Sequence, residues 1–94
     1  MITIRQPNES VVEITGHSTS QICASVSTIT CMLHNLLEEF GETFYYKDDG
    51  DKMRFCVSDN DTSKHIMNVA ISCLKDLANQ YPTFVKYTQE KRHY

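Results

Sequence analysis

The sequence lacks any apolar stretch long enough to cross a membrane, because polar residues interrupt it well before the roughly 18 residues that such a helix requires. It also lacks the apolar core of a secretory signal at its start, where Met1 to Arg5 is followed by Pro7, Asn8 and Glu9. We therefore expect a cytoplasmic protein that has no membrane partner.

Clusters of basic residues are missing as well. The formal net charge is −3, and the one adjacent pair of basic residues is Lys91-Arg92 near the end of the chain. We interpret this pair as part of a solvated tail, since the binding of nucleic acid needs a concentrated positive patch. The sequence thus predicts no nucleic acid partner.

The four cysteines form no framework for disulfides or for a metal ion. They lie inside apolar periodic segments, and without an export signal we expect reduced thiols. Cys23, Cys31 and His34 lack the paired CxxC or HxxxH spacing of structural zinc sites, which predicts no bound metal and no cofactor. We expect Cys31, Cys56 and Cys73 to be small hydrophobic residues in or beside the core.

What is present suffices for one small globular domain, with 94 residues and a hydrophobic content of 40%. Alternating apolar residues predict strands, and apolar residues at steps of three and four predict helices. The predicted strands span residues 2–5, 11–15, 42–47, 52–58 and 84–87, and the predicted helices span about residues 20–40 and 63–80. This ββαββαβ order predicts an α+β fold of two layers, in which a five-stranded mixed or antiparallel sheet carries both helices on one face.

The helical periodicity also predicts which helix residues lie in the core. Its members are Ile22, Val26, Ile29, Leu33, Leu37 and Phe40 in the first helix, and Ile66, Ala70, Cys73, Leu74, Leu77 and Tyr81 in the second. The other face of the sheet is either mostly polar or carries a partly apolar patch that includes Tyr45 and Cys56. Such a patch would suggest a dimer.

Residues 14–31 hold the two groups that a thiol-based catalyst uses. A β-branched segment ends at Gly16-His17, and a helix opens after a short loop with Cys23 near its first turn. A helix N-terminus and a nearby imidazole both favour the thiolate, which is the form of cysteine that attacks an acyl group. Ser18 or Ser20 could cap this helix, and we prefer Ser20 because it eases contact between the thiol and His17.

Structural roles are also compatible with these residues taken alone. His17 could bond to the backbone at the end of its strand, and Cys23 could be a small hydrophobic residue of the helix. We expect His34, His65 and His93 to lie at the surface without a catalytic role. Spacing alone therefore leaves the chemistry open.

Two separated motifs carry a resemblance to a known family. The first consists of Gly16-His17, Ile22-Cys23-Ala24 and Val26-Ser27. The second consists of residues 74–82 followed by Phe84-Val85-Lys86. They resemble the GH…CAxVS signature and the closing helix and strand of the ribosomal-processing cysteine protease family (Prp). The resemblance covers about residues 1–88, which we take as a single Prp-like domain, with residues 89–94 as a C-terminal tail.

The resemblance implies a peptidase that removes a short N-terminal extension from a ribosomal large-subunit protein and that forms a homodimer. Carried over by position, Cys23 would be the nucleophile and His17 the general base, beside Gly16 and Ala24 of the signature. Ser27 would supply a supporting hydrogen bond. The backbone N–H groups of residues 22–24 would bind the oxyanion.

The chain departs from the family in two places. Its loop between His17 and Cys23 is about half as long as the family's, and Ser20 stands where the family carries an acidic residue. A carboxylate there could orient the imidazole. These departures favour a second hypothesis, a pseudo-protease that binds a peptide without cutting it. A small dimeric scaffold protein is the third.

Overall fold

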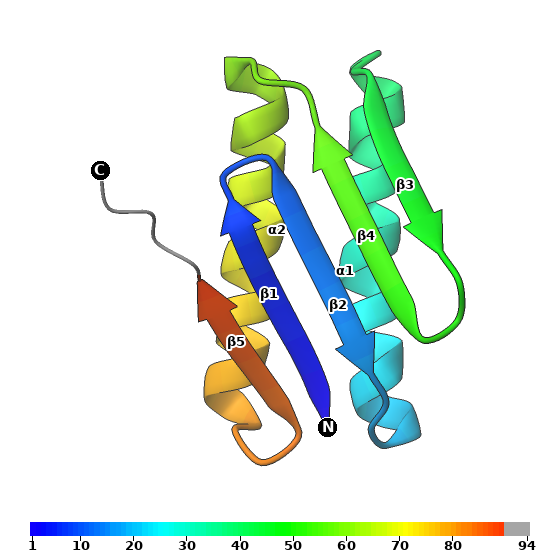
Figure 1. Cartoon of the computed structure of the whole chain (residues 1–94), viewed down its shortest axis with the longest axis vertical. Helices are drawn as coiled ribbons and strands as arrows, with labels where there is room; N and C mark the ends of the chain where they lie inside the picture. The colour runs from blue at the N-terminus through cyan, green and yellow to red at the C-terminus, as the bar shows by residue number, and fades with distance from the viewer. Residues whose placement is uncertain (90–94) are drawn as a thin grey trace.

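The computed structural model describes residues 1–89, which form the predicted ββαββαβ order (Figure 1). The elements are β1 (Ile2–Asn8), β2 (Val11–Gly16), α1 (Ser20–Glu39), β3 (Phe44–Asp48), β4 (Lys52–Val57), α2 (Asp61–Gln80) and β5 (Val85–Gln89). Gln89 ends β5 and is therefore not part of the expected tail. The rest of that tail, residues 90–94 with Lys91-Arg92 and His93, lies outside the described residues. Neither helix in the described part of the chain has the apolar length that spanning a membrane requires.

The five strands form one mixed sheet in the order β3-β4-β2-β1-β5, so the mixed alternative of the prediction is correct. β1 and β2 form a hairpin, β2 pairs antiparallel with β4, and β4 pairs antiparallel with β3. β5 lies parallel to β1, with Ile2 opposite Val85 and Gln6 opposite Gln89. A 2.8 Å hydrogen bond from the Tyr87 hydroxyl to Oε1 of Gln6 joins the same two strands.

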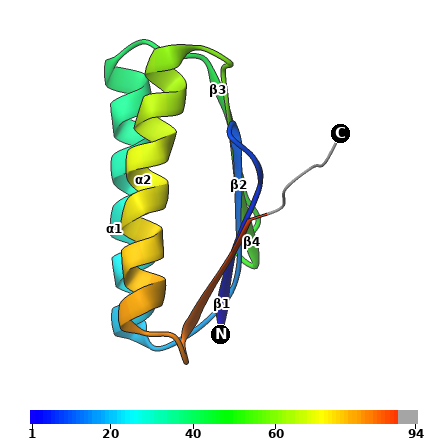
Figure 2. The ribbon, with the colours of Figure 1, turned by 90° about the vertical axis from the view of Figure 1, so that its left-hand side faces the viewer.

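Both helices cover one face of the sheet and leave the opposite face open (Figure 2). Strand residues that face the helices, such as Ile4, Val12 and Phe55, are almost fully buried, and they alternate with residues on the open face. The helices complete the core with their own apolar stripes. Truncation of a fully buried side chain such as Leu37 to alanine would lower the free energy of unfolding by roughly 2–5 kcal/mol.

The predicted helical stripes are correct at most positions, but Ile29 is only partly buried and three other members are exposed. The buried members are Ile22, Val26, Leu33 and Leu37 in α1, and Ile66, Ala70, Leu74 and Leu77 in α2. Phe40 is 61% exposed because it caps the C-terminal end of α1. Cys73 and Tyr81 are exposed because the buried stripe of α2 runs through Met67 and Ile71 instead.

The N-cap of α1 is Thr19, and not Ser18 or Ser20 as predicted. Its hydroxyl oxygen accepts a 3.3 Å hydrogen bond from the backbone N–H of Ile22, and its own backbone is extended. The helix therefore begins at Ser20, and Cys23 is its fourth residue. This placement puts the thiol one turn from the positive end of the helix dipole.

The open face of the sheet is polar. Glu13 lies at its centre and is only 4% exposed, because three cationic side chains cover it, those of Arg5, Lys52 and Arg54. The predicted partly apolar patch does not form. Tyr45 is exposed among basic side chains, and Cys56 is half-buried.

Candidate active site

The end of β2 determines the position of His17. Gly16 has a φ of +90°, and a Cβ atom at this position would collide with the carbonyl oxygen of Met1. The amino group of Met1 in turn donates a 2.8 Å hydrogen bond to the carbonyl oxygen of His17. A larger residue in place of Gly16 would therefore displace the backbone that carries the His17 ring.

The His17 ring lies beside a carboxylate from the turn between β3 and β4. Its Nε2 atom is 3.4 Å from Oδ1 of Asp51, and the N–H of Gly16 donates to the carbonyl oxygen of Asp51 at 3.3 Å. Both side chains are open to solvent, with His17 68% and Asp51 94% exposed. Such an exposed pair contributes little to stability.

The sequence gives no local signal for Asp51, which is 34 positions from His17. It belongs to a run of turn residues, Asp48 to Asp51, whose composition predicts only a hairpin. The contact follows from the pairing of β2 with β4, in which Thr15 lies opposite Lys52. The register of that pair is the information that would have identified this carboxylate.

Cys23 lies at the edge of the core, half-buried, and its Sγ donates a 3.6 Å hydrogen bond to the carbonyl oxygen of Ser18. Cys23 and His17 line the same hollow of about 180 Å³, together with Ser27 and Asp51. Within residues 1–89 no hydrogen bond joins the thiol to the imidazole, since the thiol is directed to Ser18 and Nε2 to Asp51. The two groups thus share one site without direct contact.

The first turn of α1 leaves two amides for an oxyanion, but not those that were predicted. The N–H of Ile22 donates to the Thr19 hydroxyl, and the N–H of Cys23 donates to the Thr19 carbonyl at 2.9 Å. The prediction of donors over residues 22–24 is therefore wrong at these two positions. The amides of Ser20 and Gln21 precede the first intrahelical bond, so the helix itself does not use them.

The other signature residues lie around this helix start. Ser20 and Ala24 are exposed on α1, and Ser27 lines the hollow one turn after Cys23. Among the hydrogen bonds of residues 1–89, none joins the Ser27 hydroxyl to His17 or Cys23. The supporting hydrogen bond of Ser27 therefore stays a prediction.

The hollow brings together a thiol, an imidazole and a carboxylate, the set of groups used in nucleophilic acyl transfer. In the part of the chain that the structure describes, no three His, Cys, Asp or Glu side chains are grouped so that they could hold a metal ion.

A family model described as the cysteine protease Prp matches residues 1–86, which is almost the whole described chain. The chain belongs to the Prp cysteine protease family. A comparison with curated proteins gives no significant match.

Solved structures share the fold of this Prp family member. The essential ribosomal processing protease Prp from Staphylococcus aureus, in complex with a substrate peptide, has a TM-score of 0.85 and 17% identity, covering 96% of this chain and 100% of that chain. The same protease with a covalently linked product peptide has a TM-score of 0.81 and 20% identity, with the same coverage. The protein SMU.848 from Streptococcus mutans has a TM-score of 0.73 and 23% identity, covering 95% of this chain and 93% of that chain.

A second histidine, His34, lies farther along α1 and is not the surface residue that was predicted. It lines a neighbouring hollow of about 360 Å³, and its Nδ1 is 2.8 Å from Oε1 of Glu38. Its ring stands edge-on to the rings of Phe44 and Tyr46, with centroids 5.1 and 5.3 Å away. His65, by contrast, is exposed as predicted.

The remaining cysteines of this Prp family member differ in exposure. Cys56 is half-buried as predicted, whereas Cys31 and Cys73 are exposed, so the prediction that they fill the core or its margin is wrong. Cys31 lies outside the buried stripe of α1, where its Sγ accepts a 3.7 Å hydrogen bond from Nδ2 of Asn35. Cys31 and His34 line the neighbouring hollow together.

Proposed function

We propose that the chain is a cysteine endopeptidase of the Prp type, in which Cys23 is the nucleophile and His17 is the general base. The observation that supports this most directly is the hollow at the start of α1, which both residues line. Family membership supplies the reaction class, and the free helix-start amides of Ser20 and Gln21 supply donors for a developing negative charge.

The reaction begins when the imidazole of His17 takes the proton of the Cys23 thiol. The thiolate attacks the carbonyl carbon of the scissile peptide, and the amides of Ser20 and Gln21 stabilise the oxyanion. Collapse of this intermediate breaks the C–N bond, and the imidazolium of His17 returns the proton to the leaving amine. Water, deprotonated by His17, then hydrolyses the thioester and regenerates the thiol.

This sequence of steps requires one local rearrangement. The Cys23 thiol leaves the Ser18 carbonyl and turns toward His17, which is exposed and free of packing that would hold its ring. Substrate binding favours that turn, because a peptide in the hollow replaces water around both groups. The carboxylate of Asp51 orients the imidazole, in the role that an acidic residue at position 20 would otherwise fill.

We also propose that the substrate lies extended along α1. The hollow beside Cys23 and the hollow beside His34 share Ser27, Asp48 and Met53, so they form one continuous groove between α1 and the β3–β4 hairpin. Its far part is lined by Tyr46 and Phe55 together with polar side chains such as Asn35. An N-terminal extension of a ribosomal large-subunit protein fits this groove, and the Staphylococcus aureus relative was crystallised with a substrate peptide.

The test is cleavage of a synthetic peptide that spans such an extension from the cognate ribosomal protein. We expect the wild-type chain to release two fragments in mass spectrometry, and Cys23→Ala to release none while keeping the circular dichroism spectrum of the wild type. Cleavage by Cys23→Ala, or intact peptide after prolonged incubation with the wild type, would contradict the proposal.

One observation favours the second candidate function, a pseudo-protease that holds a peptide without cutting it. The thiol is bonded to Ser18 and the imidazole to Asp51, so the catalytic contact is not preformed. This candidate predicts that the same peptide binds wild type and Cys23→Ser with equal affinity in calorimetry, and that neither variant turns it over. Fragments from the wild type would exclude it.

The homodimer and the cytoplasmic location belong to the same proposal. Met32 and Phe40 are 53% and 61% exposed on the outer side of α1, at steps of four residues with Leu36 between them. This apolar stripe offers a surface for a second copy. Sedimentation equilibrium should give the dimer mass for wild type and the monomer mass for Met32→Glu, and a monomeric wild type would refute the dimer.

A further inference from the structure

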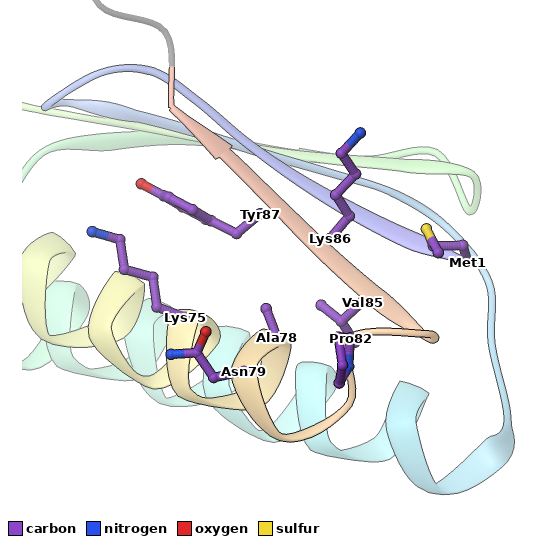
Figure 3. A pocket seen from close by; sticks show the side chains of 8 residues that line it. All are labelled: Met1, Lys75, Ala78, Asn79, Pro82, Val85, Lys86 and Tyr87. Carbon is purple, nitrogen blue, oxygen red and sulfur yellow. The ribbon is translucent and has the colours of Figure 1, made fainter.

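The open face of the sheet gathers most of the basic side chains of an acidic protein. Five of the nine lysines and arginines lie on it, and we call this set the basic face: Arg5, Lys47, Lys52, Arg54 and Lys86. Successive strand residues point to opposite faces of the sheet, and Figure 3 shows this at β5, where Lys86 points away from the helices and Tyr87 points toward them. The chain as a whole carries a formal charge of −3, so the positive charge of the open face is outweighed by negative charge elsewhere on the protein.

Strand register concentrates the cations on this face. Arg54 of β4 lies opposite Lys47 of β3 on one side and opposite Glu13 of β2 on the other. Neighbouring strands are about 4.8 Å apart, and Lys52 and Arg54, two positions apart on one strand, are separated by about 6.6 Å. These spacings are comparable to those of charges along an extended polyanion.

Two carboxylates accompany the cations without neutralising them. Glu13 accepts contacts from Arg5 at 2.8 Å, Lys52 at 3.1 Å and Arg54 at 2.8 Å. Burial alone would raise the pKa of Glu13, but the hydrogen bond from Lys52 and the three positive charges together lower it, so Glu13 is ionised at neutral pH.

The second carboxylate, Asp49, accepts hydrogen bonds from the backbone N–H groups of Lys52 at 2.8 Å and Asp51 at 3.1 Å, and these bonds lower its pKa. Among the described residues, the five cations of this face stand against two carboxylates, Glu13 and Asp49. The basic face therefore keeps an excess of three positive charges.

A hollow on this face combines charge with an aromatic side chain. It has a volume of about 440 Å³, and its lining residues are Tyr45, Lys47, Asp49, Lys52 and Arg54. Tyr45 is 57% exposed, so its ring is available to a ligand. Basic side chains beside an exposed aromatic ring are the combination that holds the backbone and the bases of single-stranded nucleic acids.

We propose that the basic face binds single-stranded nucleic acid, with phosphates on Lys47, Lys52 and Arg54 and one base stacked on Tyr45. The face does not suit a second copy of the chain, because two copies face to face would oppose like charges. An acidic peptide would satisfy the lysines and arginines but would leave the ring of Tyr45 without a matching partner. Sequence alone predicts no such partner, since these cations form no run along the chain.

The experiment measures fluorescence anisotropy of a fluorescein-labelled 12-mer of oligouridine titrated with the full chain. Binding through three or four phosphates should weaken about 20- to 50-fold between about 50 and 200 mM salt. Lys47→Glu should weaken binding at least about tenfold, because it removes one phosphate contact and adds a repulsive charge. Tyr45→Ala should weaken it about five- to tenfold through the lost stacking.

The matched control is Lys75→Glu, which changes the net charge equally but lies on α2, where Lys75 stands 5.0 Å from the ring of Tyr87 (Figure 3). We expect it to change binding less than twofold. Equal weakening by both charge reversals would overturn the proposal, as would no binding at about 50 mM salt. Binding of labelled polyglutamate as tight as that of the RNA would overturn it in favour of an acidic protein partner. None of these readouts depends on peptidase activity.

Discussion

A cysteine, a histidine and a carboxylate come together at two places along α1, yet their surroundings differ. We call them the start group, Cys23, His17 and Asp51, and the middle group, Cys31, His34 and Glu38. In the start group the imidazole is 3.4 Å from its carboxylate and 68% exposed. In the middle group that distance is 2.8 Å, and aromatic rings surround the imidazole.

We place the proposed reactive site in the start group although the contacts of the middle group are closer. The middle group lies within the helix, where backbone amides are engaged in intrahelical bonds and cannot stabilise an oxyanion. The start group lies where two amides are left over and where the helix dipole favours a thiolate.

The largest expected difference concerns the two sulfur atoms. Cys23→Ala should lower kcat/KM for peptide cleavage by at least about 10³-fold, because it removes the nucleophile. Cys31→Ala should lower kcat/KM far less, because Cys31 lines only the part of the proposed groove beside His34 and takes no part in the proposed chemistry. The rates are measured with a fluorogenic peptide. An inactive Cys31→Ala beside an active Cys23→Ala would contradict Cys23 as the nucleophile.

Thiol reactivity provides a smaller but independent contrast. Near pH 6, iodoacetamide should alkylate Cys23 faster than Cys31, because His17 lines the same hollow as Cys23 and can take the proton of its thiol. Peptide mapping by mass spectrometry of samples quenched at successive times gives both rates in one experiment. Similar rates at the two positions would mean that the start group does not activate its thiol.

Loss of stability should be larger in the middle group than in the start group, which is the reverse of the order expected for activity. His34→Ala should lower the free energy of unfolding by about 1–2 kcal/mol, because it removes edge-on contacts with two rings and the Glu38 pair. His17→Ala should change it by less than about 0.5 kcal/mol, since His17 is exposed. Urea denaturation of both variants checks this, and equal losses would show that His17 is a packing residue.

The smallest effect is expected at the carboxylates. Asp51→Asn should lower kcat about three- to tenfold because the imidazole loses its orientation, whereas Glu38→Gln should leave kcat unchanged. Adding Ser20→Asp to Asp51→Asn should restore part of the loss, because a carboxylate returns to the position that the family uses. An unchanged kcat in Asp51→Asn would remove Asp51 from the site.

Local patterns in the sequence predict most of this fold, because each element carries its own periodicity. The order of elements, both helix spans and the main core residues follow from steps of two, three and four. The helix cap does not follow, because Ser18, Thr19 and Ser20 are all side chains that cap helices. Only the backbone conformation at Thr19 distinguishes them.

Long-range features of the site and the surface are the parts that the sequence conceals. His17 and Cys23 are near in sequence and could be paired on that ground, whereas Asp51 reaches them only through the register of β2 and β4. The same register collects cations on the open face from Arg5 to Lys86. Composition records their number but not that they share a face.

The parallel pairing of β1 with β5 has a consequence for how the protein is made. β1 leaves the ribosome before β5, so one edge of β1 stays unpaired until residues 85–89 follow, and Gln6 has its hydrogen-bond partner 81 positions later. Until β5 is made, the nascent chain therefore carries an open edge that can pair with other strands. Truncation before Val85 should accordingly yield aggregates rather than a smaller folded domain, and native folding should be slow for a chain of this length.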